Sequence, residues 1–211
     1  MKKFFGLALA AVMVLALAGC GNGAQDGSQT QENGAEESEG DSIDPAGLHH
    51  VEITVKDYGT ISVELNGDAA PITVGNFLKL AGEGFYDGLT FHRVKSGFVI
   101  QGGDPKGDGT GGSGENIKGE FTSNGVLNNH LSHTRGAISM ARAKDPNSAS
   151  SQFFIVHEDS TFLDGQYACF GYVTEGMEVV DAICEEIPAE DDIGMVAAEN
   201  QPVIESIKVI D

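Results

Sequence analysis

A chain of 211 residues is long enough for one domain with a substantial buried core, with or without appended segments. Its formal net charge is −20, and its 12 lysines and arginines are spread along the sequence, which argues against a nucleic-acid binder because phosphate neutralisation needs clustered basic side chains. Tryptophan is absent, glycine occurs 29 times and long helical periodicities are scarce, so the composition favours a β-rich fold with many turns.

Residues 1–19 have the form of a secretory signal peptide. A basic start precedes an apolar run over residues 4–17, which is too short to span a membrane comfortably as a mature helix. The segment ends in LAGC at positions 17–20, which resembles the lipobox of bacterial lipoproteins, in which the cysteine is diacylated and becomes the first mature residue. Two acyl chains suffice for stable anchoring. The sequence therefore predicts an extracytoplasmic protein, lipid-anchored to the bacterial cell membrane through Cys20; the alternative is an ordinary signal peptide with an incidental cysteine.

Residues 20–47 are predicted to form the lipidated cysteine and a disordered acidic tether. The segment is rich in Gly, Gln, Ser and acidic residues, and Ile43 is its one large apolar residue. Such a composition buries too little surface to offset the entropy lost on ordering. The acids between positions 26 and 44 meet no basic residue, and we interpret this charge run as a solvated spacer without a specific partner.

The globular domain is predicted over residues 48–211. Apolar residues alternate over 51–55 and 61–65 on either side of the turn sequence DYGT at 57–60, which predicts a β-hairpin. Residues 72–81 place their apolar side chains on one face and are followed by a glycine, which predicts a short amphipathic helix.

The rest of the domain is predicted to contain mostly short strands. Strands are expected at 91–93, 98–100, 136–143, 150–155, within 162–171 after a turn, and at 203–210, with a second helix at 175–186. Many short strands with only two helices predict a mainly β fold, a closed antiparallel β-barrel with helical caps. The sequence leaves open the role of the acidic stretch 187–202, beyond linking the last helix to the last strand.

Residues 102–114, GGDPKGDGTGGSG, contain the nucleotide-like pattern GxGxxG twice. A phosphate cradle needs a following helix whose N-terminal amides face the anion, but residues 117–121 are not helical in pattern and no GK[ST] is present. We therefore reject a nucleotide site and interpret the glycines as a tight loop that brings backbone close to a bound chain.

Residues 91–104, FHRVKSGFVIQGGD, place Arg93 among apolar neighbours. Arginine keeps its charge, presents five donors in a planar fork, and is costly to bury unless those donors are satisfied. Taken alone, the stretch fits a surface arginine between two barrel strands as well as it fits a ligand-binding arginine.

Several motifs in this order resemble the cyclophilin-type peptidyl-prolyl cis-trans isomerases over residues 51–211. These are FHRVKSGFVIQGGD at 91–104, GTGG at 109–112, ISMAR at 138–142, SQFFI at 151–155, LDGQYACFG at 163–171 and EGMEVVD at 175–181. The resemblance implies an eight-stranded antiparallel closed β-barrel capped by two α-helices. It also implies an isomerase without cofactor or metal that accelerates rotation about X-Pro bonds in proline-containing polypeptides, here unfolded secreted proteins.

The same resemblance assigns site residues by motif. Arg93 matches the family's catalytic arginine. The substrate pocket is matched by Phe98, Val99, Gln101, Ala141, Arg142, Gln152, Phe154, Phe162, Leu163 and Tyr167.

This chain departs from the family pattern at four of these positions. Many members have Met in place of Val99, and Asn is common in place of Arg142. Phe162 replaces the Trp of cyclosporin-sensitive members, and Tyr167 replaces a frequent His. Bacterial-type members share the last two differences, so we expect activity to be retained and cyclosporin binding to be weak.

Other features of the sequence support less specific expectations. The six histidines are interpreted as structural or surface residues, because His-x-x-His without thiolates or well-placed carboxylates is poor support for a metal. Cys169 and Cys184 either pair or remain free thiols. We expect a monomer. Two other classes of function remain as alternatives: a peptide-binding holdase of the same fold, and a solute-binding lipoprotein, which the lipobox alone suggests.

Overall fold

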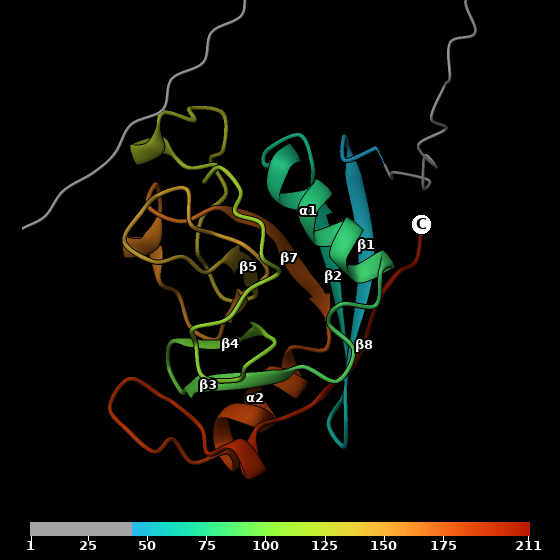
Figure 1. The fold of residues 1–211 in the computed structure, drawn as a ribbon, viewed down its shortest axis with the longest axis vertical. Coiled ribbons are helices and arrows are strands. Elements are labelled where there is room, and N and C mark those ends of the chain that lie inside the picture. The colour runs from blue at the N-terminus through green and yellow to red at the C-terminus, as the bar shows by residue number, and fades with distance from the viewer. Residues whose placement is uncertain (1–43) are drawn as a thin grey trace, which may run out of the picture. The chain divides into compact units, whose positions relative to one another are not determined.

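The computed structural model describes residues 44–211 (Figure 1). The predicted signal peptide, Cys20 and nearly all of the predicted tether lie outside these residues. No helix in the described range has the length and apolar character needed to cross a membrane.

The described residues form eight strands and two α-helices. The strands are β1 (Leu48–Val55), β2 (Gly59–Asn66), β3 (Thr90–Lys95), β4 (Val99–Asp104), β5 (Ala137–Met140), β6 (Phe153–Val156), β7 (Cys169–Glu175) and β8 (Ile204–Val209), and the helices are α1 (Pro71–Gly82) and α2 (Met177–Glu186). Short 3-10 helices lie at Thr122–Asn124, Thr161–Leu163 and Ala198–Asn200.

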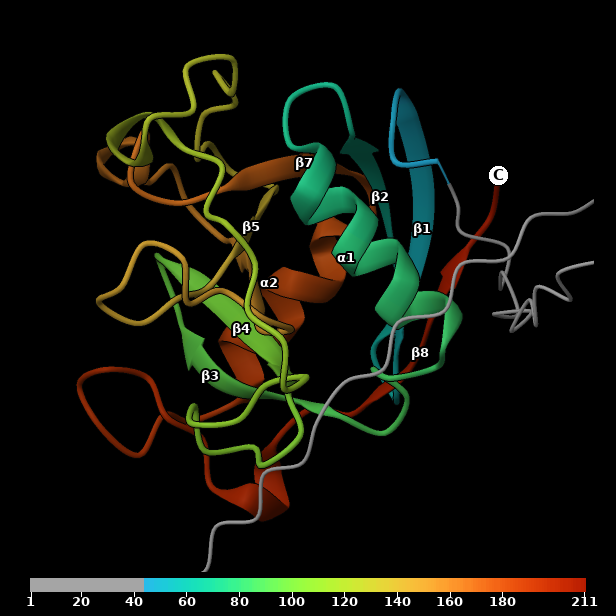
Figure 2. The ribbon, with the colours of Figure 1, turned by 45° about the horizontal axis from the view of Figure 1, so that its top comes forward.

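All eight strands belong to one curled sheet with the order β3-β4-β6-β5-β7-β2-β1-β8, in which every neighbouring pair is antiparallel (Figures 1 and 2). The two edge strands meet at one end, where Thr90 bridges to Val203 and the Phe91 amide donates to the Pro202 carbonyl at 2.9 Å. The helices α1 and α2 lie at different ends of the curled sheet. The predicted mainly β fold with eight antiparallel strands and two helices is therefore confirmed.

The β1–β2 hairpin follows directly from the alternation in the sequence. Val51 pairs with Val63 and Ile53 with Ile61, and all four side chains are buried, while the residues between them are partly exposed. A two-residue side-chain period puts one whole set of residues on the core face of the sheet. The predicted hairpin is confirmed.

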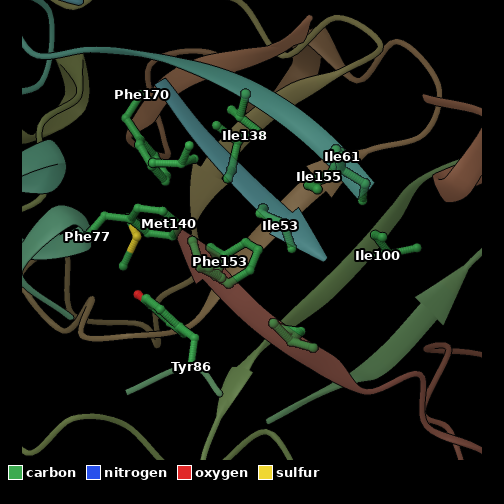
Figure 3. Close-up of a cluster of buried hydrophobic side chains, with 14 of the residues drawn as sticks. Ile53, Ile61, Phe77, Tyr86, Ile100, Ile138, Met140, Phe153, Ile155 and Phe170 are labelled. Carbon is green, nitrogen blue, oxygen red and sulfur yellow. The ribbon is translucent and has the colours of Figure 1, made fainter. Parts of the chain in front are cut away.

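The helix α1 packs its apolar face onto the inside of the sheet and contributes Phe77 to the core, beside Met140 in Figure 3. The Phe77 ring centroid lies 5.1 Å from that of Tyr86, 5.4 Å from that of Phe153 and 5.3 Å from that of Phe170. Tilted and edge-on aromatic pairs at such separations add stabilisation beyond the area they bury. The Tyr86 hydroxyl, buried with its ring, donates to the Ser151 carbonyl at 3.2 Å, so the core contains a satisfied polar group.

The N-terminus of α1 is capped from a distant part of the chain. The N-cap residue Ala70 offers no side-chain acceptor. Instead the buried carboxylate of Glu120 accepts the amides of Ile72 at 3.0 Å and Thr73 at 2.8 Å, and also the Thr73 hydroxyl at 2.7 Å. A negative charge here satisfies unpaired helix amides and complements the helix dipole.

Two strands are shorter than the sequence predicts. The expected strands at 136–143 and 150–155 form ladder pairs only over β5 and β6, which end at Met140 and begin at Phe153. Beyond the ladder one backbone bond continues the pairing, from the Ala141 amide to the Gln152 carbonyl at 2.9 Å. The segments then separate, and both residues come to line surface pockets.

Candidate active site

A pocket of about 330 Å³ brings together all but one of the residues assigned from the motifs. Gln152 is the exception, and it lines an adjoining pocket of about 580 Å³. That pocket also includes Gln101 and part of the glycine-rich loop, residues 102–114. The smaller pocket is lined by Arg93, Phe98, Val99, Gln101, Ala141, Arg142, Phe154, Phe162, Leu163 and Tyr167. The individual roles assigned to these residues stay predictions.

The floor of the smaller pocket is apolar and rigidly supported. Val99, Phe154 and Leu163 are almost fully buried and belong to one cluster of packed hydrophobic side chains. Tyr167 contacts Phe154 edge-on, with ring centroids 5.8 Å apart. Such a floor offers a dry surface to a compact apolar ring, while its own side chains have little freedom to move.

The outer wall is a stacked aromatic pair. The rings of Phe98 and Phe162 lie 5.7 Å apart at an interplanar angle of 21°. Phe162 keeps 66% of its surface exposed, which is unusual for so large an apolar side chain. The pair therefore presents apolar surface to a bound chain at the mouth of the pocket.

Arg93 enters the site through the register of β3 and β4. It pairs with Gln101 across the strands, and its Nη1 donates to Gln101 Oε1 at 3.1 Å. Gln101 Nε2 in turn donates to Gln152 Oε1 at 2.9 Å. Gln152 Nε2 donates to the carbonyls of Gly111 at 2.8 Å and Gly109 at 3.1 Å, so a chain of hydrogen bonds links the arginine to the glycine-rich loop.

Two further contacts hold the Arg93 guanidinium. Its Nε donates to the Ile193 carbonyl at 2.7 Å, and its Cζ lies 5.6 Å from the centroid of the Phe98 ring. Burial lowers the pKa of Arg93, but the ordinary value is so high that the group stays charged. Within residues 44–211, Nε and Nη1 each donate one hydrogen bond, so two of the five N–H donors are used and the others remain available.

The glycine-rich loop wraps around a buried carboxylate. Asp104 accepts the amides of Lys106 at 2.8 Å and Gly109 at 2.6 Å. Burial acts to raise the pKa of Asp104, but the backbone hydrogen bonds of the loop outweigh it and lower the pKa. At Gly111 an added Cβ would lie 2.0 Å from Asp104 Oδ1, so this glycine of the GxGxxG pattern is needed for close backbone packing against an aspartate.

Arg142, which stands where the family commonly has Asn, is fastened to its own neighbourhood. Its Nε and Nη2 both donate to the Gln166 carbonyl, at 3.0 Å and 2.8 Å. Its Cζ lies 4.6 Å from the Tyr167 ring centroid and 5.1 Å from that of Phe121. An arginine between two aromatic faces stiffens this wall of the pocket, and Phe121 is a supporting residue that sequence reasoning missed.

A buried histidine supports the floor from below. His133 is fully buried, its Nδ1 lies 2.8 Å from Asp164 Oδ1, and its Nε2 lies 3.0 Å from Ser139 Oγ. Its ring stacks on Phe154 with centroids 6.0 Å apart. Although serine, histidine and aspartate line up as in a nucleophilic triad, Ser139 is also fully buried, so the arrangement positions Phe154 and presents no nucleophile to a substrate.

Neither Cys169 nor Cys184 lines the smaller pocket. Cys169 and Cys184 are both buried free thiols, and burial raises the pKa of each to about 12. Among residues 44–211 no cluster of three or more His, Cys, Asp or Glu side chains is arranged to hold a metal ion.

Comparison with known proteins agrees with the geometry. Residues 50–209 match the family described as cyclophilin type peptidyl-prolyl cis-trans isomerase/CLD. The chain is 54% identical over 124 residues to peptidyl-prolyl cis-trans isomerase B of Bacillus subtilis, covering 59% of this chain and 82% of the relative. It is 50% identical over 127 residues to a peptidyl-prolyl cis-trans isomerase of Helicobacter pylori, covering 59% of this chain and 74% of the relative.

A solved structure extends the similarity to three dimensions. The cyclophilin-type isomerase of Cryptosporidium parvum, crystallised in the presence of the dipeptide Ala-Pro, superposes with a TM-score of 0.67 at 33% identity and covers 77% of this chain and 99% of its own. The family match spans well over half of the sequence, from the first strand to the last. With its fold and pocket, this chain belongs to the cyclophilin-type peptidyl-prolyl cis-trans isomerases, enzymes that act on proline-containing polypeptides.

Proposed function

We propose that this isomerase works by a hydrogen bond from Arg93 to the twisted X-Pro imide, with the proline ring held in the apolar pocket. An X-Pro bond has only a modest preference for trans but crosses a high barrier, because twisting it breaks amide resonance. In the twisted state the imide nitrogen regains a lone pair and accepts hydrogen bonds. An arginine beside it, donating to this nitrogen or to the adjacent carbonyl oxygen, stabilises the twisted state more than either planar state.

The observation that carries this proposal is the placement of Arg93 at the wall of the 330 Å³ pocket, held at Nε and Nη1 with other donors remaining. A preorganised donor costs no rearrangement at the moment of reaction. Phe98, Phe154 and Leu163 would grip the proline ring while the other side of the bond turns. Isomerisation of a short X-Pro peptide by the protein, and its loss on replacing Arg93, tests the assignment.

The proposed mechanism predicts a catalytic rate that is nearly flat between about pH 6 and 9, because arginine does not titrate in this interval. Burial lowers the pKa values of His92 and His133 from their ordinary 6.5, which moves their titration toward the acidic end of this interval. The measurement is kcat/KM for an X-Pro peptide as a function of pH. A bell-shaped profile that follows a histidine would contradict the mechanism.

We further propose that the enzyme acts outside the cytoplasmic membrane on unfolded secreted proteins and is anchored through a diacylated Cys20. The support is the apolar N-terminal run that ends in LAGC. In this proposal, residues 20–44 are a spacer that lets the domain contact substrates at some distance from the membrane surface. We propose that it acts as a monomer.

The anchor predicts that the full chain, expressed in a bacterium that processes lipoproteins, incorporates labelled palmitate and fractionates with membranes. The Cys20→Ala variant should lose the label, because it has no thiol at the lipobox position to acylate. Cys184→Ser is a matched control, because Cys184 is buried in the folded domain and its loss should leave labelling unchanged. Palmitate label that persists in Cys20→Ala would rule out this anchor.

A further inference from the structure

We propose that Asp191, in the acidic stretch between α2 and β8, is a positioning residue for Arg93 and acts through the carbonyl of Ile193. This inference rests on the proposed catalytic role of Arg93. The stretch follows α2 and lies beside β3 in both views of the fold (Figures 1 and 2). It gives a role to a segment that the sequence leaves unexplained.

Asp191 organises a closed turn. Its Oδ1 accepts the amides of Ile193 at 3.1 Å, Gly194 at 2.9 Å and Met195 at 3.0 Å. The Glu190 amide closes the same turn by donating to the Met195 carbonyl at 2.7 Å. These backbone hydrogen bonds lower the pKa of Asp191, as expected for a carboxylate whose charged form is bound. One side chain thus fixes the direction of three successive peptide groups.

The turn is docked on the free edge of β3, next to Arg93. The Val94 amide donates to the Gly194 carbonyl at 2.7 Å, and the Val196 amide donates to the His92 carbonyl at 3.0 Å, so Met195 lies opposite Arg93 as a backbone bridge. β3 is an edge strand of the sheet and has unpaired backbone groups to offer here.

Gly194 is required for this close approach. Its φ is +96°, and an added Cβ would lie 2.8 Å from the Val94 carbonyl oxygen. Only glycine adopts this conformation at such a distance without strain. The turn is therefore held at both ends, by the Asp191 carboxylate and by close packing on β3.

The docked turn presents one acceptor to the catalytic site. The Ile193 carbonyl accepts Arg93 Nε at 2.7 Å, while Gln101 binds Nη1 from the other side. Two hydrogen bonds at separate nitrogens fix the plane of the guanidinium, and the remaining donors then have a defined direction. Arginine otherwise has many side-chain rotamers, so an unheld guanidinium would spend much of its time in unproductive orientations.

The test compares kcat/KM and kcat for an X-Pro peptide in full-chain variants. Asp191→Ala should lower kcat by about tenfold, with a smaller change in KM, because misplacing a catalytic group by about 1 Å costs this much or more. Asp192→Ala is the matched control: it removes the same charge from the next position, but within residues 44–211 the Asp192 side chain makes no hydrogen bond, in contrast to that of Asp191. It should change kcat by less than about twofold.

A spectroscopic readout separates positioning from general destabilisation. In the NMR spectrum of the wild-type chain, the Arg93 Nε–H should exchange slowly with solvent, because it is bonded to a carbonyl. This protection should be lost in Asp191→Ala and kept in Asp192→Ala, with both variants folded by their melting curves. Asp191→Asn, which keeps an oxygen acceptor for the turn amides, should recover much of the protection and of kcat.

The outcomes distinguish this inference from the proposed role of Arg93. If Arg93→Ala abolishes turnover while Asp191→Ala behaves like wild type, the role of Arg93 stands and the inference is wrong. Equal fold-losses on adding Asp191→Ala to the wild type and to Arg93→Lys would also overturn it, because a residue that acts through Arg93 must show a non-additive double-mutant cycle. If Arg93→Ala itself retains wild-type turnover, the proposed function fails, and the inference with it.

Discussion

Replacing Arg93 by alanine is expected to lower kcat/KM for a short X-Pro peptide by about 10²-fold or more, which is the effect of removing one preorganised donor from a site where charge develops. The Nε and Nη1 contacts to Ile193 and Gln101 show that the guanidinium is already oriented before a substrate arrives. The substitution removes the charged side chain that is proposed to donate a hydrogen bond to the imide as it twists. A protease-coupled assay measures the effect.

Two variants keep this test specific. Arg93→Lys retains the charge but lacks the planar fork, so it should restore little of the lost rate if direction matters more than charge. Arg135→Ala removes an arginine that pairs with Asp181, outside the residues lining the pocket, and should leave kcat/KM close to wild type. Turnover that survives in Arg93→Ala would show that the pocket alone accelerates the reaction.

Replacing Glu120 by alanine is expected to lower the free energy of unfolding by about 3 kcal/mol, because it strips the N-terminus of α1 of its carboxylate cap and leaves buried donors without an acceptor. The side chain is 3% exposed and accepts from Ile72 and twice from Thr73. Its removal also weakens the attachment of α1, which carries Phe77 into the core. Denaturant unfolding curves measure the change.

Glu115→Ala is the control for the loss of one acidic side chain. Glu115 is mostly exposed, and its one ion pair within residues 44–211 is with Lys79 at 3.6 Å, so its replacement should cost less than about 1 kcal/mol. Glu120→Gln, which keeps one acceptor oxygen, should fall between the two. Equal stability of the Glu120 and Glu115 alanine variants would mean that the cap contributes nothing and that the amides of α1 find other partners.

The parts of the fold that could be predicted are those governed by local pattern. The β1–β2 hairpin shows its alternation within one short stretch, and α1 shows an apolar face followed by a glycine, so both could be recognised from neighbouring residues. The residues of the pocket could be predicted from the sequence, because each of them lies within a short motif that resembles the family. The mutual arrangement of these motifs in space came from the family resemblance.

The contacts that escaped prediction join positions far apart in the chain. Glu120 caps an amide 48 residues away, and Arg93 bonds to the carbonyl of a residue 100 positions away. A carbonyl has no residue-specific signature, so no pattern marks Ile193 as a partner of an arginine. The contact between the turn in the acidic stretch and β3 therefore could not be predicted from the sequence, and it is known only from the three-dimensional structure.

The most direct test of the account is two-dimensional exchange NMR on an X-Pro peptide at saturating enzyme, with its dissociation constant measured in parallel for wild type and Arg93→Ala. A residue that binds mainly the twisted state must change the exchange rate far more than the affinity. We predict that cis–trans exchange on the Arg93→Ala variant falls by about 10²-fold while the dissociation constant stays within about threefold of wild type. An unchanged exchange rate, or a loss of affinity as large as the loss of rate, would contradict the central role assigned to Arg93.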